Sequence, residues 1–393
     1  MLRSLYSGIS GLRSHQTMLD VTGNNIANVN TSAFKASAVQ FQDTLSQLTQ
    51  GVAGPQAEAG GTNPAQVGLG VRIAGISTNF AQGSTQATGR ATDMMISGDG
   101  FFVTRQGGET LFTRAGSFDF DAQGRLVSPD GAIVQGWAAV NGQINDGGAV
   151  GNITLPLEVI SSAAVTTGAT LGGNLPDDAL DGTELVRDVQ VYDAAGVSRN
   201  LSLIFTRVDD GTTDGWTVNE TGGNSVDAAN LTFASGTSTG ATQLLVGGIT
   251  VDLSALTGFA GLTTVDITSQ NGRDAGALQS FTVSADGSLI GSFSNGSSQV
   301  IARIALATFV NPGGLEKAGA SAYRATFNSG AAELATPGDP GVGSLAGGAL
   351  EMSNVDLSQE FTNLIVAQRG FQANARIITT SDEVLQELTN LKR

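Results

Sequence analysis

The sequence predicts an α+β protein in which two terminal α-helices form an antiparallel, coiled-coil-like pair and nested, mainly β domains are inserted between them. Apolar residues recur at helical spacing at both ends of the 393-residue chain, while short alternating runs separated by turn residues fill the sequence between them. Neither predicted helix has a neighbour in sequence that could cover its apolar stripe, so we expect the two helices to pair. A chain of this length exceeds one compact core, and two to four folding units are expected.

The first helix is predicted within residues 1–34. Its apolar residues alternate at three- and four-residue spacings, as in a coiled-coil seam, and the predicted contact residues are Leu2, Leu5, Ile9, Leu12, Leu19 and Ile26. Ser7, Gly11 and Ser14 form a stripe of small residues along which another helix can approach closely. Because an interior Gly costs roughly 1 kcal/mol relative to Ala, this helix is marginal on its own.

The second helix is predicted from about residue 354 to residue 391, with Ser353 as its N-cap. Its predicted contact residues include a seven-residue repeat and are Leu357, Phe361, Leu364, Phe371, Ile378, Leu385 and Leu388. Two rows of large apolar residues make this stripe wider than one partner covers, so apolar surface should remain for other copies of the chain. Residues 1–34 and 353–393 are therefore expected to form one helical domain.

The sequence between the helices predicts two β domains. Residues 35–70 are rich in Gln, Gly, Ala and Thr and are expected to form a linker or an irregular extended segment. Alternating runs predict an inner β domain from residues 71–147 and 276–352, and an outer β domain from residues 148–275. Within the outer domain, "DVQVYDAAGVSRNLSLIFTRV" predicts a hairpin that turns at Ala195–Gly196.

The stretch "NNIANVNTSAF" interrupts the first helical pattern with four asparagines, Asn24, Asn25, Asn28 and Asn30. Asn competes for backbone hydrogen bonds and so weakens a helix. Two interpretations remain open. The amides fix the register of neighbouring subunits, or Gly23-Asn24-Asn25 ends the helix and the later asparagines are turn residues.

Nothing in the sequence supports catalysis, a cofactor or a bound metal. "GTSTG" around Ser238 matches a nucleophile elbow, but a strand-like run follows where that motif needs a helix. "DFDAQGRLVSPD" (119–130) resembles a calcium loop, but strand-like residues flank it, and a hairpin turn is favoured. The single His, His15, cannot build a metal site alone, and the absence of Cys removes thiolate chemistry.

Charge and hydropathy narrow the classes of partner. The formal net charge of −16 argues against nucleic acid and anionic membranes as partners. No apolar run approaches the length of a membrane span, and Ser and Gly interrupt the N-terminal stretch where a signal peptide would be continuously apolar. An extracellular location would therefore require export without a cleaved signal.

Four segments, which occur in this order from one end of the chain to the other, resemble the bacterial flagellar axial proteins, the rod and hook group. They are "SLYSGISGLRSHQTMLDVTGNNIANVNTSAFK", "FTRAGSFDFDAQGRLVSPDG", "FSNGSSQVIARIALATFVNPGGLEKAG" and "LEMSNVDLSQEFTNLIVAQRGFQANARIITTSDEVLQELTNL". The family motif falls on Asn24, Asn25, Asn28, Asn30 and Phe34. Ala33 departs from the family pattern, which usually has Gly before Phe-Lys.

The resemblance implies a structural, non-enzymatic subunit that forms a helical tube with the terminal helices innermost. The β block at about 150–275 resembles the outer domain of hook members. This favours a subunit of the flexible hook, which acts as a universal joint that transmits torque, over a subunit of the distal rod. A secreted β-rich adhesin is the remaining alternative. Implied partners are further copies of the chain, rod and hook–filament junction proteins, the hook cap and the flagellar export apparatus. The implied location is the flagellar hook outside the cell.

Overall fold

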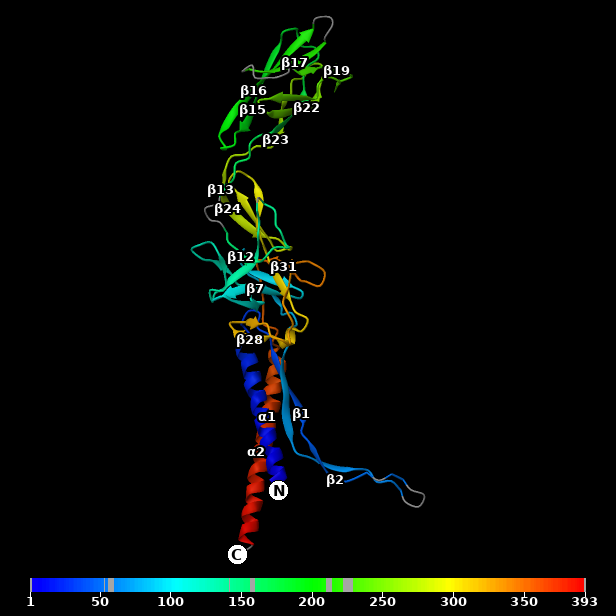
Figure 1. Ribbon diagram of the computed structural model, residues 1–393, viewed down its shortest axis with the longest axis vertical. Coiled ribbons are helices and arrows are strands. Elements are labelled where there is room, and N and C mark those ends of the chain that lie inside the picture. Colours follow the sequence, from blue (N-terminus) through cyan, green and yellow to red (C-terminus); the bar gives the residue numbers. More distant parts are fainter. Residues whose placement is uncertain are drawn as a thin grey trace. The chain divides into compact units, whose positions relative to one another are not determined.

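The computed structural model describes residues 2–52, 54–55, 60–140, 142–155, 160–209, 214–221 and 229–391. The chain divides into two compact units (Figure 1): unit 1 comprises Met1–Leu155, Thr282–Ile290 and Val300–Arg393, and unit 2 comprises Pro156–Phe281 and Gly291–Gln299. Both terminal segments belong to unit 1, so unit 2 is an insertion. The finer separation of a helical domain from an inner β domain stays a prediction.

Two α-helices occupy the ends of unit 1, α1 (Leu2–Ala27) and α2 (Leu357–Asn390). They lie side by side and antiparallel, and β structure fills the chain between them (Figure 1). The predicted fold class is therefore confirmed. Among the described residues, neither helix combines the length and the apolar character that a membrane-spanning helix needs.

The helix boundaries differ from two of the expectations. Helix α1 continues through Gly23-Asn24-Asn25 and ends at Ala27, so the interpretation that those three residues end the helix is wrong. Helix α2 is capped by Asp356, whose side chain accepts hydrogen bonds from the backbone N–H groups of Ser358 and Gln359, and Ser353 is not the N-cap. A carboxylate at the cap also interacts favourably with the positive end of the helix dipole.

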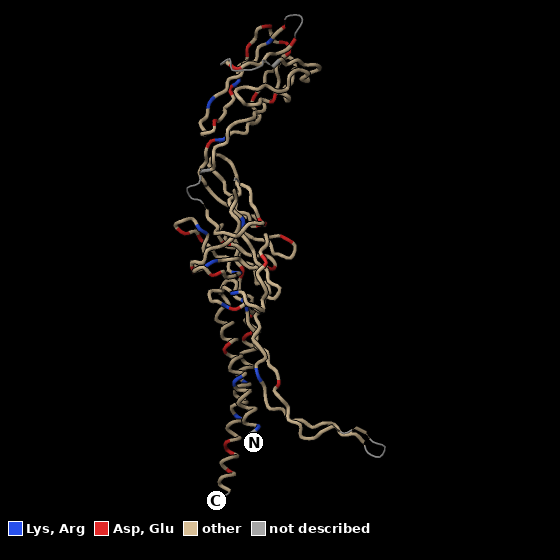
Figure 2. Tube along the Cα trace, in the orientation of Figure 1, with Lys and Arg blue, Asp and Glu red and all other residues tan. Residues whose placement is uncertain are grey.

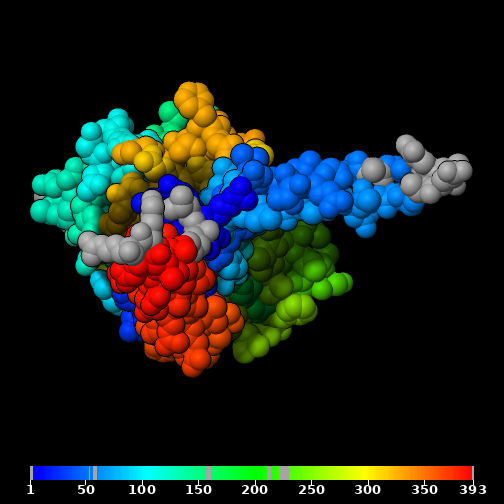
Figure 3. Space-filling view, turned by 90° about the horizontal axis from the view of Figure 1, so that it is seen from below, coloured from blue at the N-terminus to red at the C-terminus, as the bar shows by residue number. Residues whose placement is uncertain are grey.

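A paired β-hairpin occupies most of the region expected to be an irregular linker. This arm, residues 37–78, consists of two antiparallel strand pairs, β1 (Ser37–Asp43) with β4 (Val71–Thr78) and β2 (Ser46–Gln50) with β3 (Ala65–Gly68). The expectation of a linker or an irregular extended segment for residues 35–70 is wrong, because these residues pair as regular antiparallel strands. Half-buried and exposed residues alternate over the first four positions of β1 and of β4. Figure 3 shows the arm projecting sideways from the helix pair.

The base of the arm lies along α1. The backbone N–H of Val71 donates to Ser10 Oγ at 3.2 Å, and the rings of His15 and Phe41 lie 5.7 Å apart. A Cβ on Gly70 would lie 2.2 Å from Ser10 Oγ, so this close approach requires Gly at position 70. Strands β1 and β4 thus form a third layer beside the two helices.

The remainder of unit 1 is mainly antiparallel β structure in which β7 (Phe101–Gln106) pairs with β8 (Glu109–Thr113), β11 (Ile133–Ala138) and β27 (Leu306–Thr308). Further strands are β5 (Thr85–Ala87), β6 (Met94–Ser97), β9 (Asp119–Phe120), β10 (Leu126–Val127), β12 (Gly151–Asn152), β28 (Glu316–Gly319), β29 (Ala322–Arg324), β30 (Glu333–Ala335), β31 (Ser344–Gly347) and β32 (Ala349–Glu351), with the 3-10 helix η1 (Pro312–Gly314). Strands β24 (Gly276–Val283), β25 (Ser288–Phe293) and β26 (Ser298–Ile304) have residues in both units.

Aromatic rings fill one core of unit 1. Phe101, Phe112 and Tyr323 are buried, and the rings of Phe101 and Phe112 meet that of Phe309 edge-to-face with centroids 5.8 Å and 4.8 Å apart. The segment 119–130 forms the favoured hairpin rather than a calcium loop: β9 pairs with β10, and the Asp121 carboxylate accepts hydrogen bonds from the Gln123 and Arg125 backbone N–H groups and from Arg125 Nε.

Unit 2 is a β-sandwich. One sheet contains β15 (Glu184–Tyr192), β16 (Ser198–Asp209), β17 (Asp214–Glu220) and β18 (Ala229–Leu231). The other contains β14 (Gly168–Asn174), β19 (Phe233–Ala234), β20 (Thr237–Ser238), β21 (Gln243–Val246), β22 (Ile249–Thr257) and β23 (Asp266–Gln270), while β13 (Ile160–Ser161) pairs with β24. A single cluster of buried residues from both sheets, with Phe205 and Trp216 among the largest, forms its core.

Two sequence expectations within unit 2 can be compared with its strands. The hairpin predicted to turn at Ala195–Gly196 is confirmed, with β15 and β16 paired along their length and Gly196 at φ +81°. Ser238 lies in a strand and is followed by two further strands, so the strand–turn–helix context of a nucleophile elbow is not present there.

Candidate assembly interface

Helices α1 and α2 approach most closely through small residues. A Cβ on Gly11 would lie 2.7 Å from Asn374 Oδ1, and one on Gly370 would lie 2.5 Å from the His15 ring, so both positions admit little more than hydrogen. Ala367, with 0% exposure, is the buried residue of α2. The small-residue stripe predicted through Gly11 and Ser14 is therefore the place where the second helix packs; both residues are buried.

The contacts fix the stagger of the two helices. The residue numbers of each facing pair add to 385: Gly8 with Ile377, Gly11 with Asn374, and His15 with Gly370. The hydrogen bond from Asn25 Nδ2 to Glu360 Oε1 at 3.0 Å obeys the same rule near the other end of the pair. Residues beyond about 384 in α2 therefore extend past the first turn of α1.

With this stagger, some of the predicted contact residues are half-buried and others are exposed. Those that are half-buried are Leu5, Ile9, Leu12, Leu19, Ile26, Leu364, Phe371 and Ile378. Those that are exposed are Leu357, Phe361, Leu385 and Leu388, and the side chain of Leu2 lies outside the described residues. Leu385 continues the row of Ile378, but α1 has no residue opposite it. Leu357 would face position 28, after α1 has ended. As contacts with other copies, all of these residues remain predictions.

Helix α2 leaves a large apolar area in water. We call it the outer apolar surface of α2; its members are Leu357, Phe361, Ile365, Val366, Val384, Leu385 and Leu388, with relative exposures from 36% to 54%. Such side chains are normally covered, and contiguous exposed apolar area marks an interaction surface. The contact with α1 therefore leaves a set of apolar side chains of α2 exposed to water.

The asparagine stretch serves the junction between α1 and the arm. Asn25 is 1% exposed; its Nδ2 donates to the Ser37 carbonyl at 2.8 Å, and its Oδ1 accepts from the Ser37 N–H at 3.0 Å. Asn28 donates through Nδ2 to the Asn24 carbonyl at 2.9 Å and so caps the end of the helix. Asn24 and Asn30 are exposed, so only their amides are available for register contacts with other copies.

Ala33 adopts the left-handed conformation that usually belongs to Gly. Its φ is +56°, its side chain is 1% exposed, and its N–H donates to the Glu351 carbonyl at 2.8 Å. The tight turn is therefore kept in this chain despite the missing Gly, at a cost of about 1–2 kcal/mol for an L-residue. The next side chains, Phe34 and Lys35, leave this turn toward the β part of unit 1.

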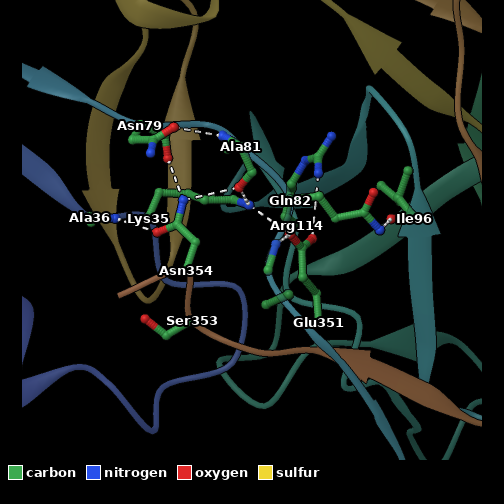
Figure 4. Close-up of polar contacts among 12 residues, drawn as sticks. Lys35, Ala36, Asn79, Ala81, Gln82, Ile96, Arg114, Glu351, Ser353 and Asn354 are labelled. Atoms are coloured by element: carbon green, nitrogen blue, oxygen red, sulfur yellow. Dashed lines mark hydrogen bonds and ion pairs between the residues drawn. The ribbon is translucent and has the colours of Figure 1, made fainter. Parts of the chain in front are cut away.

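A buried ion cluster joins the segment that follows α1 to the segment that precedes α2 (Figure 4). Lys35 Nζ lies 2.6 Å from Glu351 Oε1, with both side chains at 0% exposure, and Arg114 Nη1 lies 3.5 Å from Glu351 Oε2. The Gly83 N–H donates to Glu351 Oε1 at 2.8 Å, and Lys35 also donates to the Ala81 carbonyl at 2.8 Å. A buried carboxylate is stable only with such partners.

Burial and pairing act in opposite directions on Lys35. Burial lowers the pKa of the Lys35 ammonium, while its hydrogen bond and charge attraction to Glu351 raise it. Near the same cluster, burial raises the pKa of the Tyr323 hydroxyl to about 12. Asn354 completes the junction: its Oδ1 accepts from the Ala36 N–H at 2.9 Å, and its Nδ2 donates to the Asn79 carbonyl at 2.8 Å.

Sequence reasoning missed this cluster. Lys35 and Glu351 are 316 residues apart, and neither belongs to a periodic pattern. The available signal was Glu351 itself, a lone charge in "GGALEMSNV" directly before a helix cap. In the described part of the chain, no group of three or more His, Cys, Asp or Glu side chains could hold a metal ion. The contacts of Lys35, Glu351 and Asn354 provide packing and anchoring at this junction.

Terminal helices that clasp each other, a β insertion anchored at the point where they meet, and an uncovered apolar helix surface define a structural protein built for assembly. Three family models match the chain: "Flagella basal body rod protein" at residues 5–35, "Flagellar hook protein FlgE/F/G D1 domain" at 95–169, and "Flagellar basal body rod FlgEFG protein C-terminal" at 346–391. The first and third of these models contain most of α1 and α2.

Relatives that match over the full length of the chain are also named as flagellar hook and rod proteins. The flagellar hook protein FlgE of Treponema pallidum is 39% identical, with 100% of both chains covered, and the flagellar basal-body rod protein FlgG of Bacillus subtilis is 35% identical, also with 100% of both covered. The solved structure of the Helicobacter pylori flagellar hook protein FlgE2 matches with a TM-score of 0.48 at 15% identity, over 68% of this chain and 100% of that one. The chain belongs to the flagellar hook and rod protein family, whose members are structural proteins.

The close helix approach predicts opposite effects of filling two glycines of α1. Gly11→Leu should destabilise the helix pair by about 1–3 kcal/mol, because the new side chain must displace Asn374. Gly23→Ala is the matched control: a Cβ on Gly23 meets nothing within 4 Å, and Ala should stabilise the helix by about 0.5–1 kcal/mol. Thermal unfolding followed by circular dichroism at 222 nm measures both; equal shifts of the same sign would contradict the packing.

The ion cluster predicts a non-additive pair of substitutions. Lys35→Met leaves Glu351 buried without its closest charge partner and should lower the free energy of unfolding by about 3–5 kcal/mol. Adding Glu351→Gln removes the buried charge, and its amide oxygen can still accept from the Gly83 N–H, so the double variant should be more stable than Lys35→Met alone. Urea unfolding of the four chains provides the cycle, and strictly additive losses would refute the coupling.

Proposed function

We propose that this chain is the subunit of a bacterial flagellar hook, a flexible helical tube that transmits motor torque to the filament as a universal joint. The observation that carries this proposal is the outer apolar surface of α2, which stays in water although α2 is already clasped by α1. In the proposed assembly this surface binds a different surface of the next copy. Such a contact does not close on itself, and a helical polymer grows from it.

The arm is a second candidate contact with other copies. Of its described residues only Asp43 and Arg72 are charged (Figure 2), and Leu45, Val52 and Ile76 are 83%, 75% and 51% exposed. Isolated two-stranded hairpins are marginally stable in water, so cover by a neighbouring subunit would stabilise the arm.

In the proposed mechanism the helices and the β units have different tasks. The apolar contacts of α1 and α2 make a stiff inner tube that carries torque. The low charge of the chain, 14% of its residues, lets the β units of neighbouring copies meet through small contacts that slide when the tube bends. Further proposed partners are rod and junction proteins, the hook cap and the export apparatus. The proposed location is outside the cell, reached without a cleaved signal, with no role for nucleic acid or membrane insertion.

A distal rod subunit is the second candidate, because a relative named as a rod protein also covers the whole chain. The hook is favoured because a hook-named relative has the higher identity, 39% against 35%, and because the segment "VQVYDAAGVSRNLSLIFTRV" of unit 2 resembles the sequence of the outer domain of hook members. Electron microscopy of assembled full-length chain distinguishes the two candidates: curved, bendable tubes support the hook, and straight rigid ones support the rod.

The outer apolar surface predicts a variant that folds but does not assemble. Phe361→Ser with Ile365→Ser should leave the unfolding temperature of the monomer nearly unchanged, because these side chains are 53% and 51% exposed, and should abolish polymers. Leu364→Ser is the control on the α1-facing side and should lower the unfolding temperature. Sedimentation and negative-stain microscopy measure assembly; normal tubes from the double variant, or from a chain lacking residues 355–393, would overturn the proposal.

A further inference from the structure

A fully exposed aromatic side chain stands on a rigid loop of unit 1. Phe327 is 109% exposed, and nearby Val310 is 90% exposed. A Cβ on Gly330 would lie 3.9 Å from Val310 Cβ, so the ends of the two loops lie together. We call Val310 and Phe327 the knob. Among the residues that the structure describes, none covers the ring, although aromatic side chains are normally at least partly buried.

Hydrogen bonds hold this loop in one conformation. Thr326 Oγ1 donates to the Gly314 carbonyl at 2.6 Å, and the Thr326 N–H donates to Ser329 Oγ at 2.9 Å. Ser329, with 0% exposure, donates in turn to the Thr326 carbonyl at 2.8 Å. The ring is thus presented by an ordered backbone, which lowers the entropic cost of inserting it into a partner.

The same unit contains a hollow of about 400 Å³ that no side chain of its own fills. Its apolar lining includes Leu111, Ala115, Pro129, Ala132, Ala318 and Ala322. One wall is the β28–β29 turn, where Ala320 and Ser321 have φ of +49° and +57°, a left-handed conformation that favours Gly or Asn. The volume lies within the range of pockets that accept small apolar groups.

The knob and the hollow carry little charge, so the knob of one copy can approach the hollow of another without strong repulsion. The chain has a net charge of −16, so most faces of two copies repel each other. Residues 325–332, "ATFNSGAA", carry no charge, and Asp130 is the one charged residue that lines the hollow. A contact between these two surfaces therefore avoids the like-charge repulsion that acidic faces of two copies would have.

We propose that Phe327 of one copy inserts into this hollow on the next copy of the chain. The two surfaces are different parts of one unit, so the contact is heterologous and repeats along an open polymer. One aromatic side chain buries about 150–250 Å², well below the roughly 1,000 Å² that a stable isolated interface needs. The contact therefore forms only where the helices already hold the copies together. This inference rests on the proposed polymer and identifies one of its contacts.

Crosslinking tests the contact directly, because the chain contains no Cys. Asn328→Cys places a thiol beside Phe327 and keeps the ring, and Ala318→Cys places one at the exposed rim of the hollow. Polymers mixed from the two single-Cys chains can form an Asn328→Cys to Ala318→Cys disulfide only between copies. We expect dimers after oxidation of the mixture and far fewer from either chain alone. Mixed polymers that give no excess of dimers would overturn the proposal.

Polymerisation itself provides the second test. Phe327→Ala should raise the concentration of unpolymerised subunit by about 10- to 100-fold, and Phe327→Leu should restore most of the loss. Ala318→Trp, which fills the hollow from an exposed position, should act like Phe327→Ala, and combining the two should add little. Unchanged thermal unfolding of each monomer shows that the fold is intact. Wild-type levels of polymer from both variants would refute the contact, whereas a wild-type chain that never polymerises would instead refute the proposed function.

Discussion

The buried pair of Lys35 and Glu351 is the constraint on which the rest of unit 1 depends. Lys35 follows α1 after the Ala33 turn, and Glu351 precedes the cap of α2, so burying these charges together brings both helix ends to one point. Each is the closest charge partner of the other, and Arg114 Nη1 also lies 3.5 Å from Glu351 Oε2, so removing Lys35 or Glu351 leaves buried charge with less compensation. The chain between Lys35 and Glu351, which contains the β-strands of both units, leaves and returns through the same junction.

The sequence predicted the helix pair because its signals are local. Seven-residue spacing identified α2, and the stripe through Gly11 and Ser14 identified the side of α1 that packs against it. The stagger was not predictable, since it depends on which small residue faces which: Gly370 against His15 decides that Leu385 lies beyond α1. The arm was missed because its signals are weak. Half-buried and exposed residues alternate over only four positions in each of β1 and β4, and β2 and β3 are exposed throughout.

The β parts of the two units bury their apolar side chains more fully than the helix pair does. The sandwich of unit 2 closes its core with Phe205 and Trp216 fully buried, and the aromatic core around Phe101 does the same in unit 1. The helices, by contrast, bury one side and leave large apolar residues on the other. The exposed apolar side chains of α2 are therefore the part of the chain that a contact with another molecule would cover.

The bond between Asn25 and Glu360 spans 335 residues of sequence, a separation with a consequence for quality control. A ribosome makes α1 first, and α1 then waits for almost the entire remaining chain before its partner exists. Contacts of such long range close late in folding. A prematurely terminated product, even one with every β-strand correctly formed, would lack the second half of the clasp. In the proposed assembly, completion of the last helix would therefore separate intact chains from truncated ones.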